Sequence, residues 1–176
     1  DDILLMLLPV LTKVVLVPPP PPSINDLTSF APSTPTADGK SDKKYAIDAM
    51  KRTHDWALKC FAEYKKQCDP NKQTLFPIVQ GVTYEDLRIE SAKFVDKLDS
   101  FGVAIGGLSV GEPKEVMYKM VDVVIPHLSD HKPRYLMGVG TPEDLIENVY
   151  RGVDMFDCVL PTRPVSYTHL RAHETV

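Results

Sequence analysis

Two hydrophobic patterns alternate along the chain. Short apolar runs, each followed by glycine or polar residues, are typical of strands buried on both faces. These runs cover residues 2–8, 75–81, 103–105, 134–137 and 152–160. From residue 43 onward, other segments repeat apolar residues every three or four positions, as helices with one buried face do. These segments cover residues 43–66, 84–98, 113–124 and 142–151. The alternation predicts an α/β fold of parallel strands with crossover helices.

Local signals mark the helix starts and the first buried helix face. Thr83 and Thr141 stand just before helical segments, where a hydroxyl group can accept a hydrogen bond from the first turn. Pro113 and Pro142 suit the first helical turn because proline has no N–H group to leave unpaired. The apolar stripe of the helix over 43–66 contains Ile47, Met50, His54, Ala57, Leu58 and Phe61. We interpret His54 as a core histidine rather than a catalyst.

Two segments stand apart from this pattern. Residues 18–41 begin with five consecutive prolines and continue with small and polar residues. We expect this segment to be a disordered surface insertion, because it has too little apolar surface to offset the entropy of ordering. Residues 164–176 resemble one reading frame of a sequencing adapter, and we treat them as a non-native tail. The predicted domain therefore covers residues 1–163.

Composition narrows the class of protein. The chain has 176 residues, enough for one domain with a core, and its formal net charge of −4 gives no overall basic footprint. Three scattered cysteines are too few for a disulfide framework or a zinc site. They favour a reduced compartment, and we expect the cytoplasm. The apolar run at residues 3–8 is far too short to cross a membrane.

Candidate chemistry lies just after the strands. In barrels of parallel strands, the loops at these ends build the active site. Gln80 offers two donors and one acceptor, and paired glycines at 106 and 107 allow close approach of a flat ligand. Met137 could lie against an aromatic face, and Asp157 could act as a carboxylate nucleophile at an anomeric carbon. The pattern predicts a planar base held against a nucleophile.

Each of these residues also has an ordinary structural explanation. Asp157 could be satisfied by backbone donors, and Gly106 with Gly107 could simply form a tight turn. Gln80 could bind a neighbouring loop, and Met137 could fill the core. Residues 138–141 could instead cradle a phosphate before a helix, although no lysine follows at the spacing of a P-loop.

Four segments together resemble the tRNA-guanine transglycosylases, also called queuine tRNA-ribosyltransferases. The resemblance covers roughly residues 43–163. Its motifs are Val-Gln-Gly at 79–81, Ala-Ile-Gly-Gly-Leu-Ser-Val-Gly-Glu at 104–112, Lys-Pro-Arg-Tyr-Leu-Met-Gly-Val-Gly at 132–140 and Gly-Val-Asp-Met-Phe-Asp-Cys-Val-Leu-Pro-Thr-Arg at 152–163.

The resemblance implies a (β/α)₈ TIM barrel, incomplete here at both ends, and a pentosyltransferase activity. It implies that Asp157 attacks C1′ of the wobble guanosine of tRNA and forms a covalent ribosyl-enzyme. Queuine, or a deazaguanine precursor, then takes the ribose. Asp154 is the less suitable nucleophile, because its motif position differs and strand alternation places it on the other face. Arg163 is expected to contact the tRNA backbone. The expected base-binding residues are Gln80, Gly106, Gly107, Leu108, Met137 and Gly138.

The sequence also departs from the family pattern. Leu8 stands where the family has an aspartate that binds the base, which favours an alternative: a non-catalytic subunit that binds tRNA or a partner. The family's general acid/base is expected upstream of Asp1 and its zinc ligands beyond Arg163, so no residue of this chain is assigned to a metal. We therefore expect the chain as given to be inactive. The resemblance implies a homodimer, or a heterodimer with a non-catalytic paralogue.

Overall fold

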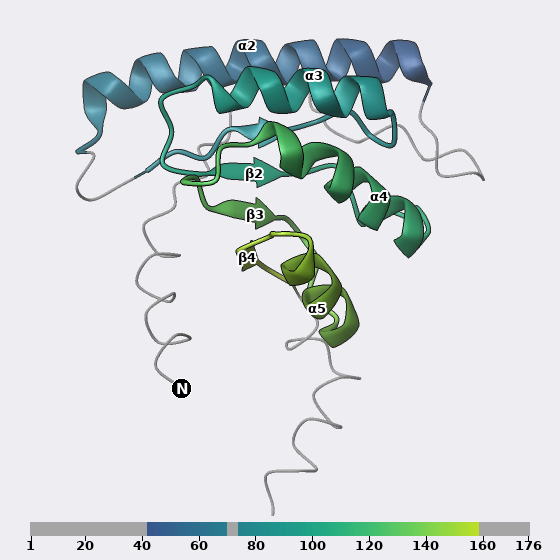
Figure 1. Cartoon of the computed structure of the whole chain (residues 1–176). Helices are drawn as coiled ribbons and strands as arrows, with labels where there is room; N and C mark the ends of the chain where they lie inside the picture. Colours follow the sequence, from purple (N-terminus) through teal and green to yellow (C-terminus); the bar gives the residue numbers. More distant parts are fainter. Residues whose placement is uncertain (1–41, 70–73, 159–176) are drawn as a thin grey trace, which may run out of the picture.

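The computed structural model describes residues 42–69 and 74–158 (Figure 1). Expectations about the opening strand, Leu8, residues 18–41, Arg163 and the tail at 164–176 lie outside this part. The described chain begins with a long helix, α2 (Lys43–Gln67). It continues with α3 (Glu85–Asp96), α4 (Lys114–Val124), the 3₁₀ helix η2 (Ile125–His127) and α5 (Pro142–Tyr150).

Four short parallel strands form the sheet, and they lie side by side in chain order. The strands are β1 (Ile78–Val79), β2 (Val103–Ile105), β3 (Arg134–Leu136) and β4 (Met155–Phe156). Their register aligns Ile78 with Ala104, Ala104 with Tyr135, and Tyr135 with Met155. Each of the first three strands is followed by a helix that returns the chain to the next strand, which is the repeating unit of a TIM barrel. The predicted α/β architecture is confirmed as part of such a barrel.

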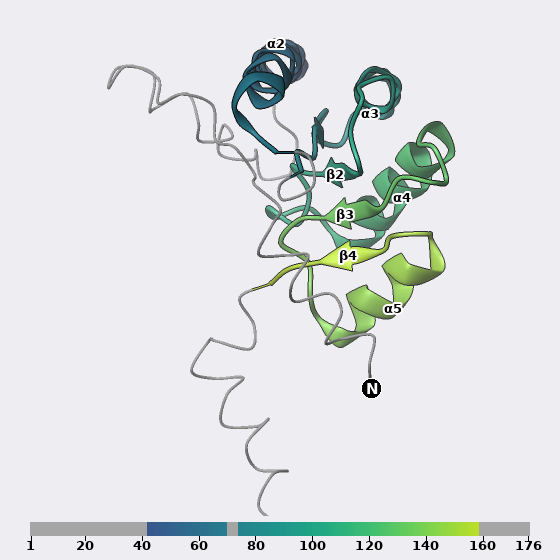
Figure 2. The ribbon, with the colours of Figure 1, turned by 90° about the vertical axis from the view of Figure 1, so that its left-hand side faces the viewer.

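The sheet has two differently covered faces. Helices α3, α4 and α5 cover one face (Figure 2). The core between them and the sheet contains the strand residues Val79, Val103, Ile105 and Leu136. On the other face, the inner one in a closed barrel, the buried residues are Phe76, Ala104, Tyr135 and Met155, with Ile78 and Met137 packed against them. This alternation follows from the two-residue period of strands and decides which strand-end side chains share a face.

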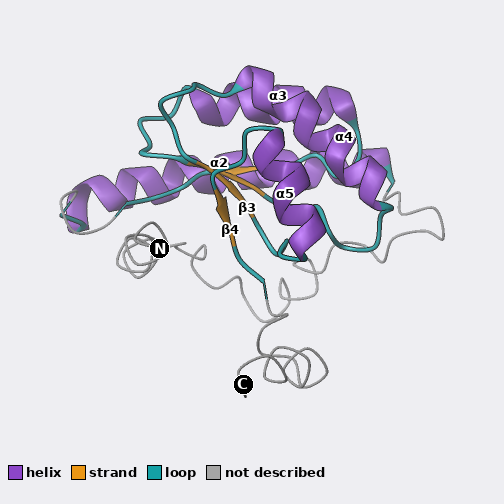
Figure 3. Ribbon diagram, turned by 60° about the horizontal axis from the view of Figure 1, so that its bottom comes forward, coloured by secondary structure: helices purple, strands orange, loops and turns teal. Residues whose placement is uncertain are grey.

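Helix α2 packs on α3. Figure 3 shows the helices in purple and the strands in orange. Ala46 and Met50 contact Leu87, and the His54 ring stacks on Phe94 at a centroid distance of 4.0 Å. The predicted stripe is wrong at one position, because Leu58 is 50% exposed. Successive residues turn by about 100° around a helix, so Leu58 lies at the rim of the stripe centred on Met50, His54 and Phe61.

The two predicted threonine caps have different outcomes. Thr141 is the N-cap of α5, and its hydroxyl oxygen accepts a hydrogen bond from the Asp144 N–H at 3.2 Å. The prediction for Thr83 is wrong: α3 begins at Glu85 with Tyr84 at the N-cap, and no described residue bonds the buried Thr83 hydroxyl. The left-handed φ of 52° at Val82 carries the chain through a turn that displaces Thr83 from the helix start.

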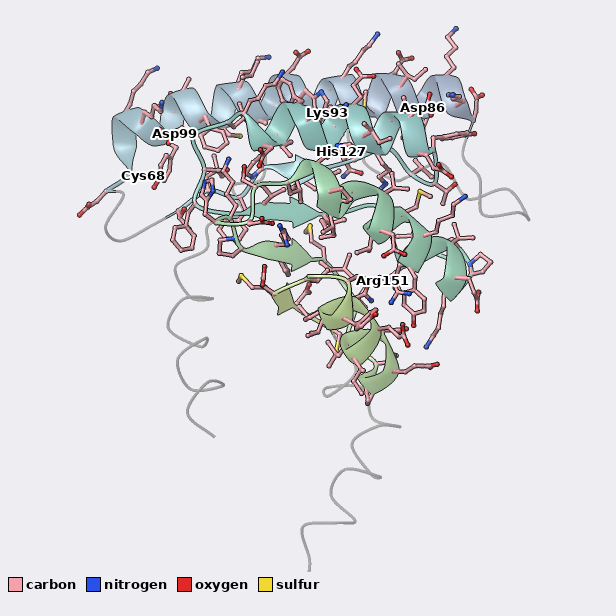
Figure 4. All side chains as sticks on the ribbon, viewed as in Figure 1. Cys68, Asp86, Lys93, Asp99, His127 and Arg151 are labelled. Atoms are coloured by element: carbon pink, nitrogen blue, oxygen red, sulfur yellow. The ribbon has the colours of Figure 1, made fainter. Side chains whose placement is uncertain are left out.

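Polar contacts fix α5, the helix before β4, against α4. Arg151, labelled in Figure 4, binds Asp122 of α4 at 3.3 Å and Glu147 of α5 at 2.6 Å. At the other end of α5, the buried Asp144 accepts hydrogen bonds from Tyr118 and lies 3.0 Å from the Lys114 Nζ atom. Because only four residues separate α5 from β4, these contacts also restrict where β4 begins. No helix in the described part of the chain is long and apolar enough to span a membrane.

Candidate active site

The predicted site residues follow the carboxyl ends of the four strands. Gln80, Gly106, Met137 and Asp157 each come directly after the last residue of a strand. Each lies two positions beyond an inner-face residue, so strand alternation directs it to the inner face of the sheet. Loops at this end of parallel strands carry the active sites of TIM barrels.

The region around Gly106 brings three of these residues together. A Cβ atom placed on Gly106 would lie 2.8 Å from the Ile78 side chain, 3.4 Å from the Met137 sulfur and 3.5 Å from Gln80 Nε2. Gly107 has a left-handed φ of 65°, and a Cβ atom there would lie 2.6 Å from Gln80 Oε1. A larger residue at Gly106 would therefore displace the Ile78 side chain, and one at Gly107 would displace the Gln80 amide. The structure assembles Gln80, Gly106, Gly107 and Met137 into one cluster, which we call the base platform.

Asp157 lies beyond the end of β4 and is held by β3. Its Oδ1 atom accepts hydrogen bonds from the Tyr135 hydroxyl group and from the Gly138 N–H, both at 2.7 Å. Burial, and then the hydrogen bond to Asp157, raise the pKa of Tyr135, so the phenol keeps its proton and remains a donor. Within the described residues, the second oxygen of Asp157 has no hydrogen-bond partner. One carboxylate oxygen is thus positioned and the other is available.

The apolar run at residues 152–160 predicted a strand buried on both faces, but Asp157 within it is exposed. Met155 is the last buried inner-face residue of β4, and the carboxylate projects past it. Gly138 next to it has a φ of 75°, and no atom lies within 4 Å of the position that a Cβ atom would take. The space beside Gly138, whose N–H group donates to Asp157, is therefore open.

Two other candidates occupy different places. The Leu108 side chain packs into the core between sheet and helices, so only its backbone could face a ligand on the inner side. Asp154 lies at the opposite end of β4, where its carboxylate accepts a hydrogen bond from the Arg134 N–H at 2.8 Å. Its own N–H group donates to the Arg134 carbonyl oxygen at 2.9 Å. Asp154 therefore ties β3 to β4 and lies away from the platform.

The phosphate alternative at residues 138–141 finds little support in the geometry. The Gly138 N–H group is already donated to Asp157. The first turn of α5 carries Glu143 and the buried Asp144, whose negative charges oppose an anion at that helix terminus. The geometry does not favour a phosphate site here.

Sequence reasoning missed Arg88, the largest fully buried side chain of the described chain. From α3 its guanidinium donates hydrogen bonds to the carbonyl oxygens of Gly106 at 2.6 Å and Gly107 at 2.9 Å. It also donates to Val82 at 2.7 Å and Val79 at 3.4 Å. Burial lowers the pKa of Arg88 to about 9, with the charge of Glu112 opposing the shift, so the group stays charged at neutral pH. An arginine on the buried face of an amphipathic helix is the sequence signal that could have found it.

A second contact links the outer helices to the base platform. The Gln80 N–H donates a hydrogen bond to the hydroxyl oxygen of Ser91 on α3 at 3.0 Å. That hydroxyl lies 2.9 Å from His54 Nε2 on α2. Burial lowers the pKa of His54, and the charges of Glu90 and Asp55 oppose the shift in part. The interpretation of His54 as a core residue agrees with its burial and its stacking.

The zinc expected from the family resemblance has no ligands in the described part of the chain. Within residues 42–69 and 74–158, no three or more histidine, cysteine, aspartate or glutamate side chains gather so as to hold a metal ion. The residues present do not fit such a site, and the chemistry below uses none.

Comparison with known proteins identifies the family. The family model described as queuine tRNA-ribosyltransferase matches residues 30–170. The chain belongs to this family. A queuine tRNA-ribosyltransferase of Symbiobacterium thermophilum is 57% identical over 122 residues, which are 69% of this chain and 30% of that protein. Relatives with the same name include one from Herpetosiphon aurantiacus, 60% identical over 119 residues, which are 68% of this chain and 29% of that protein.

A third relative of that name, from Staphylococcus haemolyticus, is 56% identical over 123 residues, which are 70% of this chain and 32% of that protein. The chain spans about a third of the length of these queuine tRNA-ribosyltransferases. All four strand ends of the site lie inside the segment that the family model matches.

Proposed function

We propose that the full-length protein exchanges the wobble guanine of tRNA for queuine or a deazaguanine precursor, with Asp157 as the nucleophile. The observation that carries this proposal is the position of Asp157. One of its oxygens is fixed by Tyr135 and Gly138, the other is unpartnered among the described residues, and the side chain is exposed. A carboxylate held in this way is suited to covalent catalysis at a sugar carbon.

The proposed exchange has two displacements at C1′ of the ribose. In the first, the free oxygen of Asp157 bonds to C1′ as the bond to the guanine nitrogen breaks, and the departing guanine takes up one proton. In the second, a nitrogen of the incoming base bonds to C1′, that base loses one proton, and Asp157 is released as a carboxylate. The negative charge of Asp157 stabilises the positive charge that develops on the sugar in each transition state.

The base platform supplies the recognition in this proposal. The Gln80 amide and the N–H groups of Gly107 and Leu108 offer hydrogen-bonding groups on one edge, while the Met137 thioether offers an apolar surface for a ring. Leu108 can take part only through its backbone, because its side chain lies in the core. Arg163, outside the described residues, is proposed to contact the tRNA backbone.

The test is incorporation of labelled guanine into tRNA by full-length protein, with a matched pair of variants. Asp157→Asn keeps an oxygen that can accept from Tyr135 and Gly138 but removes the nucleophile, and incorporation is expected to disappear. Asp154→Asn makes the same chemical change at the other end of β4, and incorporation is expected to survive. Equal loss in both variants, or activity in Asp157→Asn, would contradict the assignment. A wild type that binds tRNA without any incorporation would support the non-catalytic subunit instead.

A further inference from the structure

We propose that Arg88 is a positioning residue that fixes which hydrogen-bonding groups the paired glycines present to the base. This inference rests on the proposed function, because it assigns a specificity role within the same pocket. It starts from the fact that one buried guanidinium holds the carbonyl oxygens of both Gly106 and Gly107.

The peptide geometry determines what remains for a ligand. No peptide bond in the described chain is cis, so each C=O group points opposite to the N–H group of the next residue. With the carbonyls of Gly106 and Gly107 directed at Arg88, the N–H groups of Gly107 and Leu108 point away from it. Neither of these N–H groups has a hydrogen-bond partner among residues 42–69 and 74–158. The two peptide groups that join Gly106 to Gly107 and Gly107 to Leu108 thus offer donors only.

The residues that follow in the loop are held by Glu112. The Glu112 carboxylate accepts hydrogen bonds from the N–H groups of Ser109 and Val110. Arg88 therefore binds the carbonyl oxygens that precede the Gly107 and Leu108 N–H groups, and Glu112 binds the N–H groups that follow them. Gly107 has a φ of 65°, and glycine changes between backbone conformations at little cost, so the two peptides need such anchoring to keep one orientation.

The chemical consequence is a preference for a base edge that carries an acceptor. A carbonyl oxygen on the base can accept from the free N–H groups, whereas an amino group there would face donors. A base without the oxygen would leave the N–H groups unpaired, which a site built for hydrogen bonding penalises strongly. Without the two hydrogen bonds from Arg88, the peptides could turn a carbonyl oxygen toward the base, and the preference for a base with an acceptor would weaken.

The matched control for Arg88 is Arg134, which also donates to backbone carbonyls, at Gly152 and Leu128. Arg134 lies at the opposite end of the strands from the base platform, at the start of β3. Arg88→Lys keeps the charge but loses the planar fork that bonds both carbonyls. Arg134→Lys makes the same change where no base is proposed to bind.

The experiment measures binding of guanine and of 2-aminopurine, which lacks the oxo group, to full-length protein by calorimetry, together with kcat/KM for guanine exchange. Wild type and Arg134→Lys are expected to prefer guanine equally. In Arg88→Lys this preference should fall by roughly tenfold, the worth of about one hydrogen bond. Hydrogen exchange in wild type should show slower exchange of the Gly107 and Leu108 amides when guanine is bound than with 2-aminopurine. This measurement uses the wild type alone, so it still tests the proposal if Arg88→Lys fails to fold.

The outcomes separate the two proposals. An unchanged preference in a folded Arg88→Lys, or equal amide protection by both bases, overturns the role of Arg88. If the protein still exchanges guanine, the proposed function stands. A guanine preference that depends on Arg88 in a protein without exchange activity overturns the function and supports the positioning role. Failure of wild type to bind either base overturns both.

Discussion

Replacing Gly107 by alanine tests whether the base platform works as the geometry implies. The new Cβ atom would lie 2.6 Å from Gln80 Oε1, and the amide would have to move by roughly 0.8 Å to reach an ordinary contact distance. That displacement removes one or two hydrogen bonds to the base, each worth about 0.5–1.5 kcal/mol. We therefore expect kcat/KM for guanine exchange to fall roughly 10- to 100-fold.

The control is Gly152→Ala, which has a similar backbone penalty away from the site. Gly152 has a φ of 96°, and its added Cβ atom would meet mainly the flexible end of Arg134 at 3.2 Å. Both variants should lose about 1–2 kcal/mol of the free energy of unfolding, the cost of a left-handed alanine. Guanine exchange kinetics and urea unfolding of full-length protein measure both effects. Equal kinetic losses in the two variants, or an unchanged kcat/KM in Gly107→Ala, would refute the reasoning.

Two further predictions concern the contacts that hold the site. Tyr135→Phe removes one of the two donors to Asp157. Since a hydrogen bond to a charged group is worth about 1.5–3 kcal/mol, kcat for guanine exchange should fall roughly 10- to 100-fold while KM for guanine stays nearly constant. An unchanged kcat would show that the Gly138 hydrogen bond alone is enough. His54→Gln should remove a pH dependence of the free energy of unfolding. Because burial lowers the pKa of His54 below 6.5, the unfolded chain binds a proton first, so wild type should lose stability as the pH falls below 6.5. Urea titrations at pH 7.5 and 5.5 should show a smaller loss in the variant, and identical losses would contradict this role.

The sequence signals that succeeded were local ones. The period of residues 43–66 predicts α2 to within one residue, and Thr141 followed by Pro142 predicts the start of α5. The order of strands and helices was enough for a parallel sheet, because crossover connections leave few alternatives. The grouping of Gln80, Gly106 and Met137 at one edge followed from the same topology.

The signals that failed depend on tertiary contacts. The partners of Arg88 are carbonyl oxygens 6 to 19 residues away, on other segments, and most arginines on helices are exposed. The direction of the Leu108 side chain depends on the left-handed turn at Gly107, which sequence alone does not fix. The exposure of Asp157 depends on how far β4 extends past Met155. These failures occur at the site itself, where backbone geometry serves ligand binding rather than local propensity.

The proposed covalent bond between Asp157 and ribose can be measured directly. Full-length protein would be denatured in acid while guanine exchange is running, digested with nuclease and protease, and analysed by mass spectrometry. The account predicts a ribose-linked nucleotide on the peptide that contains Asp157, and its absence in Asp157→Asn. An adduct on another residue, or rapid exchange with no adduct on that peptide, would contradict it.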